Sequence, residues 1–257
     1  GASGNIGAAL FVEAVARGRT PIGTYRRNPK PGLVEFDLIG NRLHDVAPDL
    51  DSHHTVIILA AAIDPDWVFA NADEAHAINV EYTQRCIDDA HRAGAQVLFM
   101  SSEAVFARPS PEGYAESAQP QPDTLYARQK VSVEEYLIGL PRSCVVRTGR
   151  NVGWSLENVM CPVAATYRTL LSDDARMAAD NIFTLTDSRD TAHGLLDIAD
   201  SELVGIIHLA ANPPICRTAL ADAVMAASRQ GGDMAYETIS FSALEYLESR
   251  TNCTWIK

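Results

Sequence analysis

The sequence predicts an α/β fold in which a doubly wound parallel sheet is followed by a small C-terminal portion. Short apolar runs rich in β-branched residues alternate with helical patterns, as they do in βαβ units. The chain has 257 residues, enough for one such domain with a modest appendage. We therefore expect a first domain over residues 1–150 and a mixed portion over residues 151–257 that completes the sheet and adds a lobe.

The first element is a glycine-rich turn at the head of an apolar helix. Glycines let a backbone approach a pyrophosphate, and the unpaired N–H groups and dipole of the following helix attract the anion. The spacing is G-x-x-G-x-x-G rather than the usual G-x-G-x-x-G, so a plain structural turn is the alternative. Such a turn follows a strand, and we expect a strand upstream. The residues predicted to seat the phosphates are Gly1, Ser3, Gly4, Asn5, Ile6 and Gly7.

Strands and helices then alternate along the chain. Apolar runs predict strands at residues 21–25, 33–37, 55–60, 96–101, 143–147 and 205–209. Helical patterns occupy residues 73–93, 126–137, 159–171, 188–198 and 217–227. Prolines interrupt residues 107–123, which we interpret as a loop, either a lid over the active site or an ordinary surface loop.

Two arginines at the end of the second predicted strand indicate the cofactor. An acidic residue at this position accepts hydrogen bonds from the ribose 2′-OH of NAD, whereas arginines can clamp a 2′-phosphate. Arg26 and Arg27 therefore favour NADP(H), with NAD(H) as the alternative cofactor. The competing interpretation treats both side chains as solvated surface charges.

A tyrosine and a lysine spaced one helical turn apart carry the catalytic prediction. On a helix, Tyr126 and Lys130 share one face, where the ammonium charge can lower the pKa of the phenol towards the range of a useful proton donor. Ser102 follows the predicted strand at residues 96–101 and can donate a hydrogen bond to a carbonyl oxygen. These three residues together predict general-acid catalysis at a carbonyl.

The glycine turn, the Ser-Glu-Ala-Val-Phe block at residues 102–106 and the Tyr-x-x-x-Lys helix resemble the extended branch of the short-chain dehydrogenase/reductase superfamily. Within it, the chain is most similar to the sugar-nucleotide reductase group of dTDP-4-dehydrorhamnose reductase. The resemblance covers residues 1–211 and implies a Rossmann-type dinucleotide-binding domain with a substrate-binding lobe. Relatives often pair through helices beside the catalytic one, so a homodimer is one of the oligomeric states left open.

The resemblance assigns further roles. Lys130 would hydrogen-bond the nicotinamide ribose beside Tyr126, and Asn79 would shape its helix and hold ordered water near the lysine. Asp37 and Leu38 would lie near the adenine. The segment Leu59, Ala60 and Ala61 resembles the small-residue segment after the family's fourth strand, counting the expected upstream strand as the first, and would line the cofactor groove, although tight packing alone also explains it.

The substrate is less well specified. A nucleotide-sugar diphosphate needs cations, and those available after the catalytic helix are Arg142, Arg147, Arg150 and Arg168. Trp154 can stack on a base or sugar ring, or lie buried. Ala104 stands where sugar-nucleotide dehydratases place a glutamate, so a dehydratase is disfavoured, and Glu103 and Ala104 both depart from the residues usual in the reductases.

Three functions remain open at this stage. The favoured one is an NADPH-dependent reductase that transfers hydride to a carbonyl, a 4-keto group of a nucleotide sugar or a related secondary-metabolite ketone. The second is an epimerase on the same scaffold. The third is a non-catalytic, dinucleotide-binding regulatory subunit.

Charge, hydropathy and cysteine spacing argue against several other classes of protein. The net charge of −12 argues against a nucleic-acid partner, which would need a basic face. No apolar run reaches the roughly 18 residues of a membrane span, and the five cysteines form no C-x-x-C pair. We therefore expect a cytoplasmic protein with reduced thiols, no membrane contact and, in the absence of a His/Asp/Glu cluster, no metal.

Overall fold

The main sheet of the protein is wholly parallel. The computed structural model describes residues 1–110, 112–153, 161–228 and 231–257. Four strands pair in the order β10-β5-β4-β3: β3 (Thr55–Ile58), β4 (Gln96–Ser102), β5 (Ser143–Thr148) and β10 (Gly205–Leu209). Strands β1 (Gly23–Tyr25) and β2 (Leu33–Glu35) form a separate parallel pair beside it. The predicted parallel α/β architecture is confirmed.

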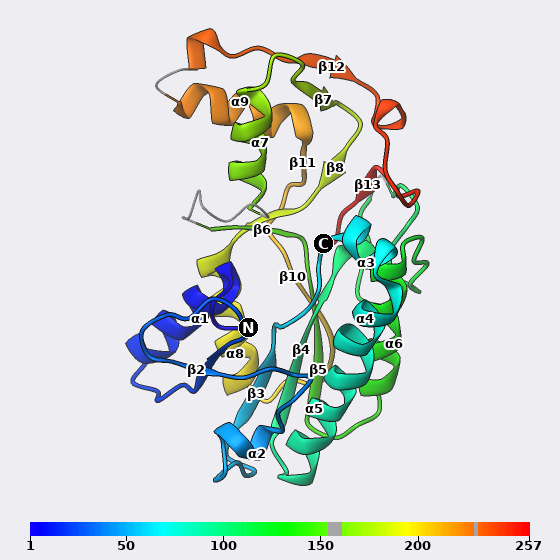
Figure 1. Ribbon diagram of the computed structural model, residues 1–257. Helices are drawn as coiled ribbons and strands as arrows, with labels where there is room; N and C mark the ends of the chain where they lie inside the picture. Colours follow the sequence, from blue (N-terminus) through cyan, green and yellow to red (C-terminus); the bar gives the residue numbers. More distant parts are fainter. Residues whose placement is uncertain (111, 154–160, 229–230) are drawn as a thin grey trace.

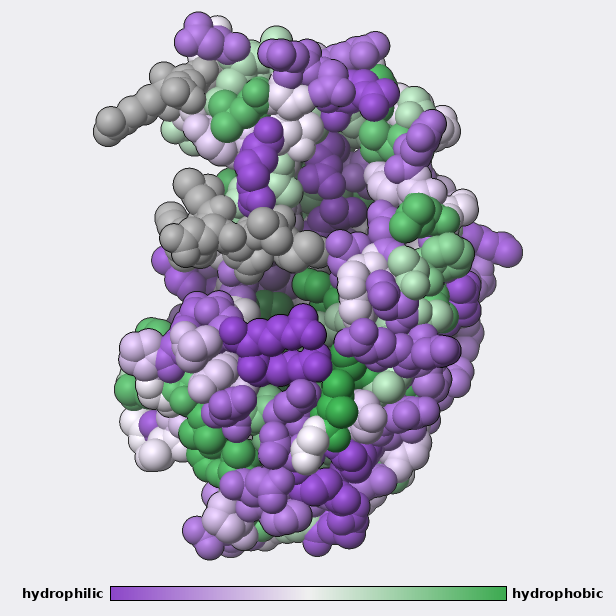
Figure 2. Space-filling view, viewed as in Figure 1, coloured by the Kyte–Doolittle hydropathy of each residue, from purple (hydrophilic) through white to green (hydrophobic). Residues whose placement is uncertain are grey.

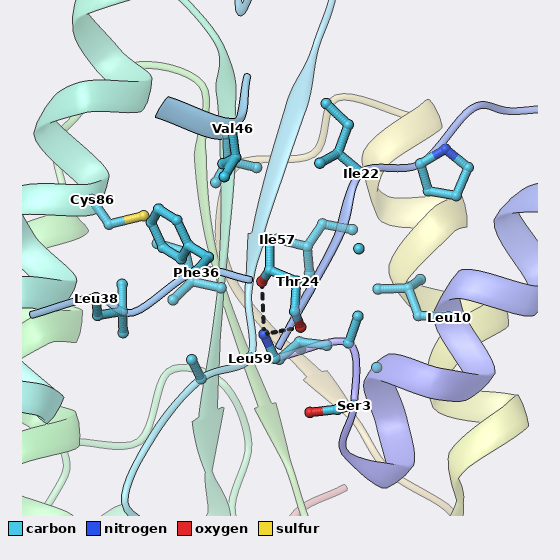
Figure 3. Close-up of a pocket in the computed structure, with 18 of the residues that line it drawn as sticks. Ser3, Leu10, Ile22, Thr24, Phe36, Leu38, Val46, Ile57, Leu59 and Cys86 are labelled. Carbon is cyan, nitrogen blue, oxygen red and sulfur yellow. Dashed lines mark hydrogen bonds between the residues drawn. The ribbon is translucent and has the colours of Figure 1, made fainter. Parts of the chain in front are cut away.

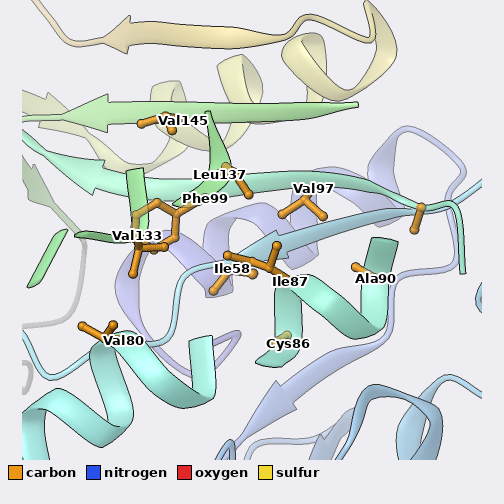
Figure 4. Close-up of a cluster of buried hydrophobic side chains, with 11 residues drawn as sticks. Ile58, Val80, Cys86, Ile87, Ala90, Val97, Phe99, Val133, Leu137 and Val145 are labelled. Atoms are coloured by element: carbon orange, nitrogen blue, oxygen red, sulfur yellow. The ribbon is translucent and has the colours of Figure 1, made fainter. Parts of the chain in front are cut away.

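Helices cover both faces of the sheet (Figure 1). Helices α5 (Tyr82–Arg92) and α6 (Leu125–Leu137) pack on one face, and α1 (Asn5–Ala16) and α8 (Ser188–Asp200) pack on the other. Side chains alternate along β4, so Val97 and Phe99 enter the core beneath α5 and α6 (Figure 4), while Leu98 and Met100 enter the core beneath α8. This double burial explains the continuous apolar runs of the central strands.

The helix predicted at residues 73–93 is present, but a π-helical turn interrupts it near its centre. It comprises α4 (Ala72–His76), a π-helical turn η1 (Ala77–Glu81) and α5. A preceding helix, α3 (Pro65–Ala70), was not expected; Asp64 caps it by accepting hydrogen bonds from two N–H groups of its first turn. Two other short elements, α2 (Leu43–Val46) and the 3₁₀ turn η2 (Glu103–Val105), flank the sheet. The π turn matters because single π turns are frequent at functional sites.

A smaller lobe stands over the carboxyl ends of the central strands (Figure 1). Its helices are α7 (Pro162–Leu170) and α9 (Arg217–Ala227), and its strands are β7 (Arg176–Ala178), β8 (Ile182–Phe183), β11 (Ile215–Cys216), β12 (Glu237–Ile239) and β13 (Cys253–Thr254). The paired strands β6 (Arg150–Val152) and β9 (Leu185–Asp187) join it to the main lobe. Two 3₁₀ turns, η3 (Gly231–Asp233) and η4 (Phe241–Ala243), complete the small lobe.

The chain returns from the small lobe to the main sheet through α8 and β10, so the C-terminal portion contributes to both lobes. The space-filling view is hollowed between the lobes and largely hydrophilic outside (Figure 2). Across the described ranges, no helix is long and apolar enough to cross a bilayer.

Candidate active site

The glycine turn is shaped by close packing. A Cβ at Gly7 would stand 2.2 Å from the Gly1 carbonyl oxygen and 2.6 Å from the Ala2 Cα, and one at Gly1 would stand 2.9 Å from the Leu59 Cβ. Only Gly4 tolerates a side chain, because its nearest neighbour lies at 3.5 Å. Gly4 is the N-cap of α1, with no side-chain cap and no acidic residue in the first turn. The first N–H groups of α1 therefore remain available to an anion.

A cavity of about 1080 Å³ opens beside this turn. Most of the predicted cofactor residues line it: Gly1, Ser3, Gly7, Arg26, Arg27, Asp37, Leu38, Leu59, Ala60 and Ala61. Five of the predicted residues do not line it. Gly4 is the N-cap of α1, Asn5 and Ile6 are the first residues of that helix, and Tyr126 and Lys130 lie on α6 (Leu125–Leu137). Figure 3 shows Ser3 at one end of this cavity and Val46 towards the other.

The charged residues of the cavity are arranged around β1 and β2. Arg26 Nε lies 3.1 Å from Asp37 Oδ2, so the two predicted groups form an ion pair that holds the guanidinium beside the groove. Arg27 is exposed on the same rim. A negatively charged ligand at this rim would meet two guanidinium groups.

Helix α6 brings the predicted tyrosine and lysine together. Thr124 caps the helix, accepting a hydrogen bond from the Ala127 N–H at 3.2 Å, and fixes where its first turn begins. Tyr126 and Lys130 are both buried, and Lys130 Nζ lies 5.8 Å from the centre of the Tyr126 ring. The ammonium donates a hydrogen bond to the Met100 carbonyl at 2.8 Å, which fastens α6 to β4.

The two adjacent serines at the end of β4 have different partners. Ser101 is buried and hydrogen-bonds the Glu134 carboxylate, whereas Ser102 is half-buried and accepts the Ala104 N–H at 3.1 Å. A hydrogen bond from Ser102 to Tyr126 acts to lower the pKa of the phenol. The structure therefore brings Ser102, and not Ser101, to the tyrosine.

The expected direction of the phenol pKa is wrong for this structure. Burial raises the pKa of Tyr126 to about 12 and outweighs the effect of Ser102. Burial also lowers the pKa of Lys130 to about 8, against the opposing charge of Glu134. Desolvation penalises both charged forms, and at this depth it exceeds the attraction that helix spacing alone suggested.

Asn79 lies on the π turn and links α6 to the strand end beside the cavity. Its Oδ1 accepts the Ala62 N–H at 2.8 Å, and its Nδ2 donates to the Ala62 carbonyl at 3.0 Å and to Gln129 Oε1 at 2.8 Å. Ala62 lines the cavity and also packs in one cluster with Tyr126. Asn79 thus fixes the distance between the strand end that borders the groove and the helix that carries Lys130.

Two of the four arginines proposed for substrate binding, Arg142 and Arg147, have other partners in the structure. Arg142 lies at the amino end of β5, where it donates to the Ser52 carbonyl and pairs with Glu202. Arg147 is 1% exposed and forms a bidentate pair with Glu134. Arg168 lies on α7, and Trp154 falls outside the described residues. Local sequence could not show that Arg147 is committed to a buried partner.

Arg150 is joined by an arginine that the sequence interpretation missed. The Arg150 and Arg217 guanidinium carbons lie 4.4 and 5.1 Å from the centre of the Phe183 ring. Neither forms an ion pair with a carboxylate within 4.0 Å among the described residues. Burial, reinforced by the charge of Arg150, lowers the pKa of Arg217 to about 10. The two guanidinium groups thus lie together without a close carboxylate, an arrangement that favours an anion.

Glu103 is a second residue beside the site to which the sequence assigned no role. It is buried directly after Ser102 and its Oε2 accepts the Thr184 N–H at 3.2 Å. Burial raises the pKa of Glu103 to about 8, although Arg150 opposes that rise. The side chain therefore ties the turn that follows Ser102 to the segment that bears Phe183.

The fold is the one shared by solved structures named dTDP-4-dehydrorhamnose reductase. Residues 1–244 match the family described as the RmlD substrate binding domain, and the chain belongs to that family.

Individual relatives agree with this assignment. The chain is 26% identical over 249 residues to a dTDP-4-dehydrorhamnose reductase of Sinorhizobium fredii, which covers 93% of this chain and 80% of that protein. It is 28% identical over 139 residues to methionine adenosyltransferase 2 subunit beta of Bos taurus, covering 54% of this chain and 41% of that one. The structure of dTDP-4-dehydrorhamnose reductase from Bacillus anthracis in complex with NADP covers 100% of this chain and 88% of that one, with a TM-score of 0.82 at 20% identity. This structural likeness shows the shared fold.

Proposed function

We propose that the protein is an NADPH-dependent reductase of a 4-keto group in a nucleotide sugar or a related ketone, with Tyr126 as the general acid. The observation that carries the proposal is the convergence of Ser102, Tyr126 and Lys130 where β4 ends, linked through Asn79 to the cavity beside the glycine turn. Relatives named dTDP-4-dehydrorhamnose reductase support the substrate class.

The residues of the cavity fit a phosphorylated dinucleotide. The cradle at Gly1 and Gly7 would be filled by any Cβ, and the first N–H groups of α1 have no side-chain cap. Arg26 and Arg27 would hold the 2′-phosphate that distinguishes NADPH from NADH. When bound, the cofactor supplies the hydride for the reduction.

The side chains of the site divide the remaining tasks. Ser102 holds the substrate carbonyl oxygen by a hydrogen bond, and Tyr126 delivers a proton to the alkoxide oxygen that develops there. Lys130, at 5.8 Å from the phenol ring, stabilises the phenolate left behind. Arg150 and Arg217 bind the diphosphate of the substrate in the cleft between the lobes.

One observation favours a second candidate, a non-catalytic regulatory subunit: the match of 139 residues to methionine adenosyltransferase 2 subunit beta. The intact Ser102, Tyr126 and Lys130 weigh against it. An epimerase is distinguished by its cofactor balance, since it consumes no net NADPH.

The deciding experiment is a turnover screen with NADPH against 4-keto nucleotide sugars and simpler ketones. Stoichiometric oxidation of NADPH with formation of the alcohol is the expected result. Interconversion of sugars without net oxidation would establish an epimerase instead. Cofactor binding without turnover of any ketone in the panel would favour the regulatory subunit.

A further inference from the structure

A segment that follows the small lobe lies against α3 and the start of α6. We call residues 246–251 the strap. The chain reaches it by descending from β12 to the side of α3 (Figure 1), where Arg250 pairs with Asp66. Thr251 Oγ1 donates a hydrogen bond to Asp123 Oδ2 at 2.8 Å, immediately before the capping residue of α6. The strap is thus bound to two elements of the main lobe.

Glu248 of the strap is buried against the first residue of α6. Its side chain is 8% exposed, and the Leu125 N–H donates to both carboxylate oxygens, at 2.7 and 2.9 Å. Arg128 Nη2 donates to Glu248 Oε1 at 2.9 Å and balances the buried charge. A carboxylate is also favoured at this end of a helix by the helix dipole. An N–H group that opens α6 therefore has a partner from a distant part of the chain.

The first turn of α6 has two side-chain acceptors with different effects. Thr124 accepts the Ala127 N–H at 3.2 Å, and Glu248 accepts the Leu125 N–H. Thr124 belongs to the same segment as the helix and moves with it, so it determines where the helix begins along the chain. Glu248 belongs to another segment, so it determines where that first turn lies relative to the rest of the molecule.

The first turn of α6 carries Tyr126, which directly follows Leu125. Lys130 lies one turn further along and is fastened separately, through its hydrogen bond to the Met100 carbonyl at 2.8 Å. A shift or fraying of the first turn would therefore displace the phenol of Tyr126 more than the ammonium of Lys130.

We infer that Glu248 is a positioning residue for Tyr126: by accepting the Leu125 N–H, it holds the first turn of α6 where the phenol reaches the substrate oxygen. The inference rests on the proposed function, in which Tyr126 is the general acid. A misplacement of about 1 Å can lower a catalysed rate by about 100-fold, so one remote hydrogen-bond acceptor can have a large kinetic effect.

Steady-state kinetics of three variants test the inference. Glu248→Ala should lower kcat by about tenfold or more and change KM for NADPH and for the ketone by less than about twofold, because Lys130 keeps its own anchor. Glu248→Gln keeps an oxygen that can accept the Leu125 N–H and should regain most of kcat. Glu245→Ala removes an exposed carboxylate two residues before Leu247 and is the matched control. Wild-type kcat in Glu248→Ala, or no recovery in Glu248→Gln, would overturn the proposal.

If Glu248→Ala does not fold, Leu125→Pro and Leu125→Ala decide the question. Both lose the leucine side chain, but only proline lacks the N–H that Glu248 accepts. Proline suits the first position of a helix, and Thr124 before it is already extended, with φ −97° and ψ 155°. The expected kcat of Leu125→Pro is about tenfold below that of Leu125→Ala. Equal kcat in the two variants would contradict the role of the hydrogen bond.

Amide hydrogen exchange tests Glu248 without any turnover. In Glu248→Ala the Leu125 and Ala127 amides should exchange about tenfold faster than in the wild type, whereas the Glu134 amide, further along α6, should keep its rate. A protein that reduces no ketone would contradict the proposed reductase function, and the exchange rates would still show whether Glu248 holds the first turn. Unchanged exchange at Leu125 and Ala127 would overturn the positioning role whatever the activity.

Discussion

Tyr126 illustrates how burial and charge compete at a single residue. Its phenol is 9% exposed, and its pKa of about 12 keeps it protonated across the working range of pH. A protonated phenol is ready to donate, and the neighbouring Lys130 and Ser102 favour the phenolate formed when it does. The general-acid role that we propose for Tyr126 therefore does not require a low pKa in the resting protein.

Tyr126→Phe should reduce the rate of ketone reduction by about 10²- to 10⁴-fold, because it removes a general acid while keeping the ring that packs against Ala62. Affinity for NADPH should change little. Steady-state turnover and cofactor titration measure the two quantities. Tyr136→Phe, an exposed tyrosine on the same helix, is the control and should keep its activity; full activity in Tyr126→Phe would remove the residue from the mechanism.

Replacing both Arg26 and Arg27 by alanine should weaken NADPH binding by about tenfold or more and leave NADH binding nearly unchanged, because only NADPH has a 2′-phosphate for the guanidinium groups. Fluorescence titration with each cofactor measures this. Lys30→Ala removes a nearby exposed charge outside the cavity and serves as the control. An equal loss for both cofactors would contradict the assignment.

The raised pKa of Glu103 should make the free energy of unfolding depend on pH. Its pKa of about 8 in the folded protein exceeds the ordinary 4.5, so the folded state binds the extra proton between these values. The contribution of Glu103 is therefore present below about pH 4.5 and is lost as the pH rises through about 8. Glu103→Gln should show a smaller decline in the free energy of unfolding between about pH 5 and about pH 8, measured by urea denaturation. Parallel profiles of variant and wild type would show that Glu103 does not titrate in this window.

At the scale of elements, a buried polar network fastens α6 to the sheet near Tyr126 and Lys130. Glu134 of α6 pairs with Arg147 of β5, both side chains being 1% exposed, and also accepts the Ser101 hydroxyl of β4. Lys130 adds its bond to the Met100 carbonyl one helical turn earlier. The helix is thus held against β4 and β5 by polar contacts that the sequence pattern treats as apolar core positions.

Arg147→Met should lower the free energy of unfolding by about 3–5 kcal/mol, because it leaves the Glu134 carboxylate buried without its cation. The double variant Glu134→Leu/Arg147→Met should recover most of that loss, since no buried charge remains. Urea denaturation of the single and double variants tests the pair. A double variant as unstable as the single one would mean that packing, not charge, dominates here.

At the scale of the molecule, the cleft between the lobes is where the chain brings distant cations together. Arg150 begins β6 beside the main sheet and Arg217 begins α9 in the small lobe, and they meet at Phe183. Glu103 links the same segment back to the serine of the active site. In the proposed function the small lobe thus contributes to the substrate site, and its position relative to the sheet would determine the distance between the substrate's anion and its carbonyl.

Arg150→Ala and Arg217→Ala should each raise KM for nucleotide-diphosphate substrates by about tenfold while changing KM for simple ketones little, because only the former carry the anion. Initial-rate kinetics with both substrate classes measure the split. Arg92→Ala, on the exposed face of α5, is the control. A uniform loss with both classes would assign the two arginines to structure rather than to substrate binding.

Features that depend on local sequence were predicted well. The strand at residues 205–209 and the helix at residues 217–227 agree with the structure in both bounds, because apolar periodicity and breakers are local signals. The spacing of Tyr126 and Lys130 on one helix was likewise fixed by the sequence. The separation of the β1–β2 pair from the four-stranded sheet was not predicted, since strand pairing is a long-range property.

By itself, the sequence determined the parallel α/β class, the glycine turn and the spacing of Tyr126 and Lys130 on one helix, because each of these depends on residues close together along the chain. Only the tertiary structure decided which of the arginines considered for substrate binding lack a carboxylate partner among the described residues. Arg147 is committed to Glu134, whereas Arg217 joins Arg150 from another lobe. It also decided that desolvation sets the pKa of Tyr126, because burial depends on segments far apart in sequence that pack over the phenol.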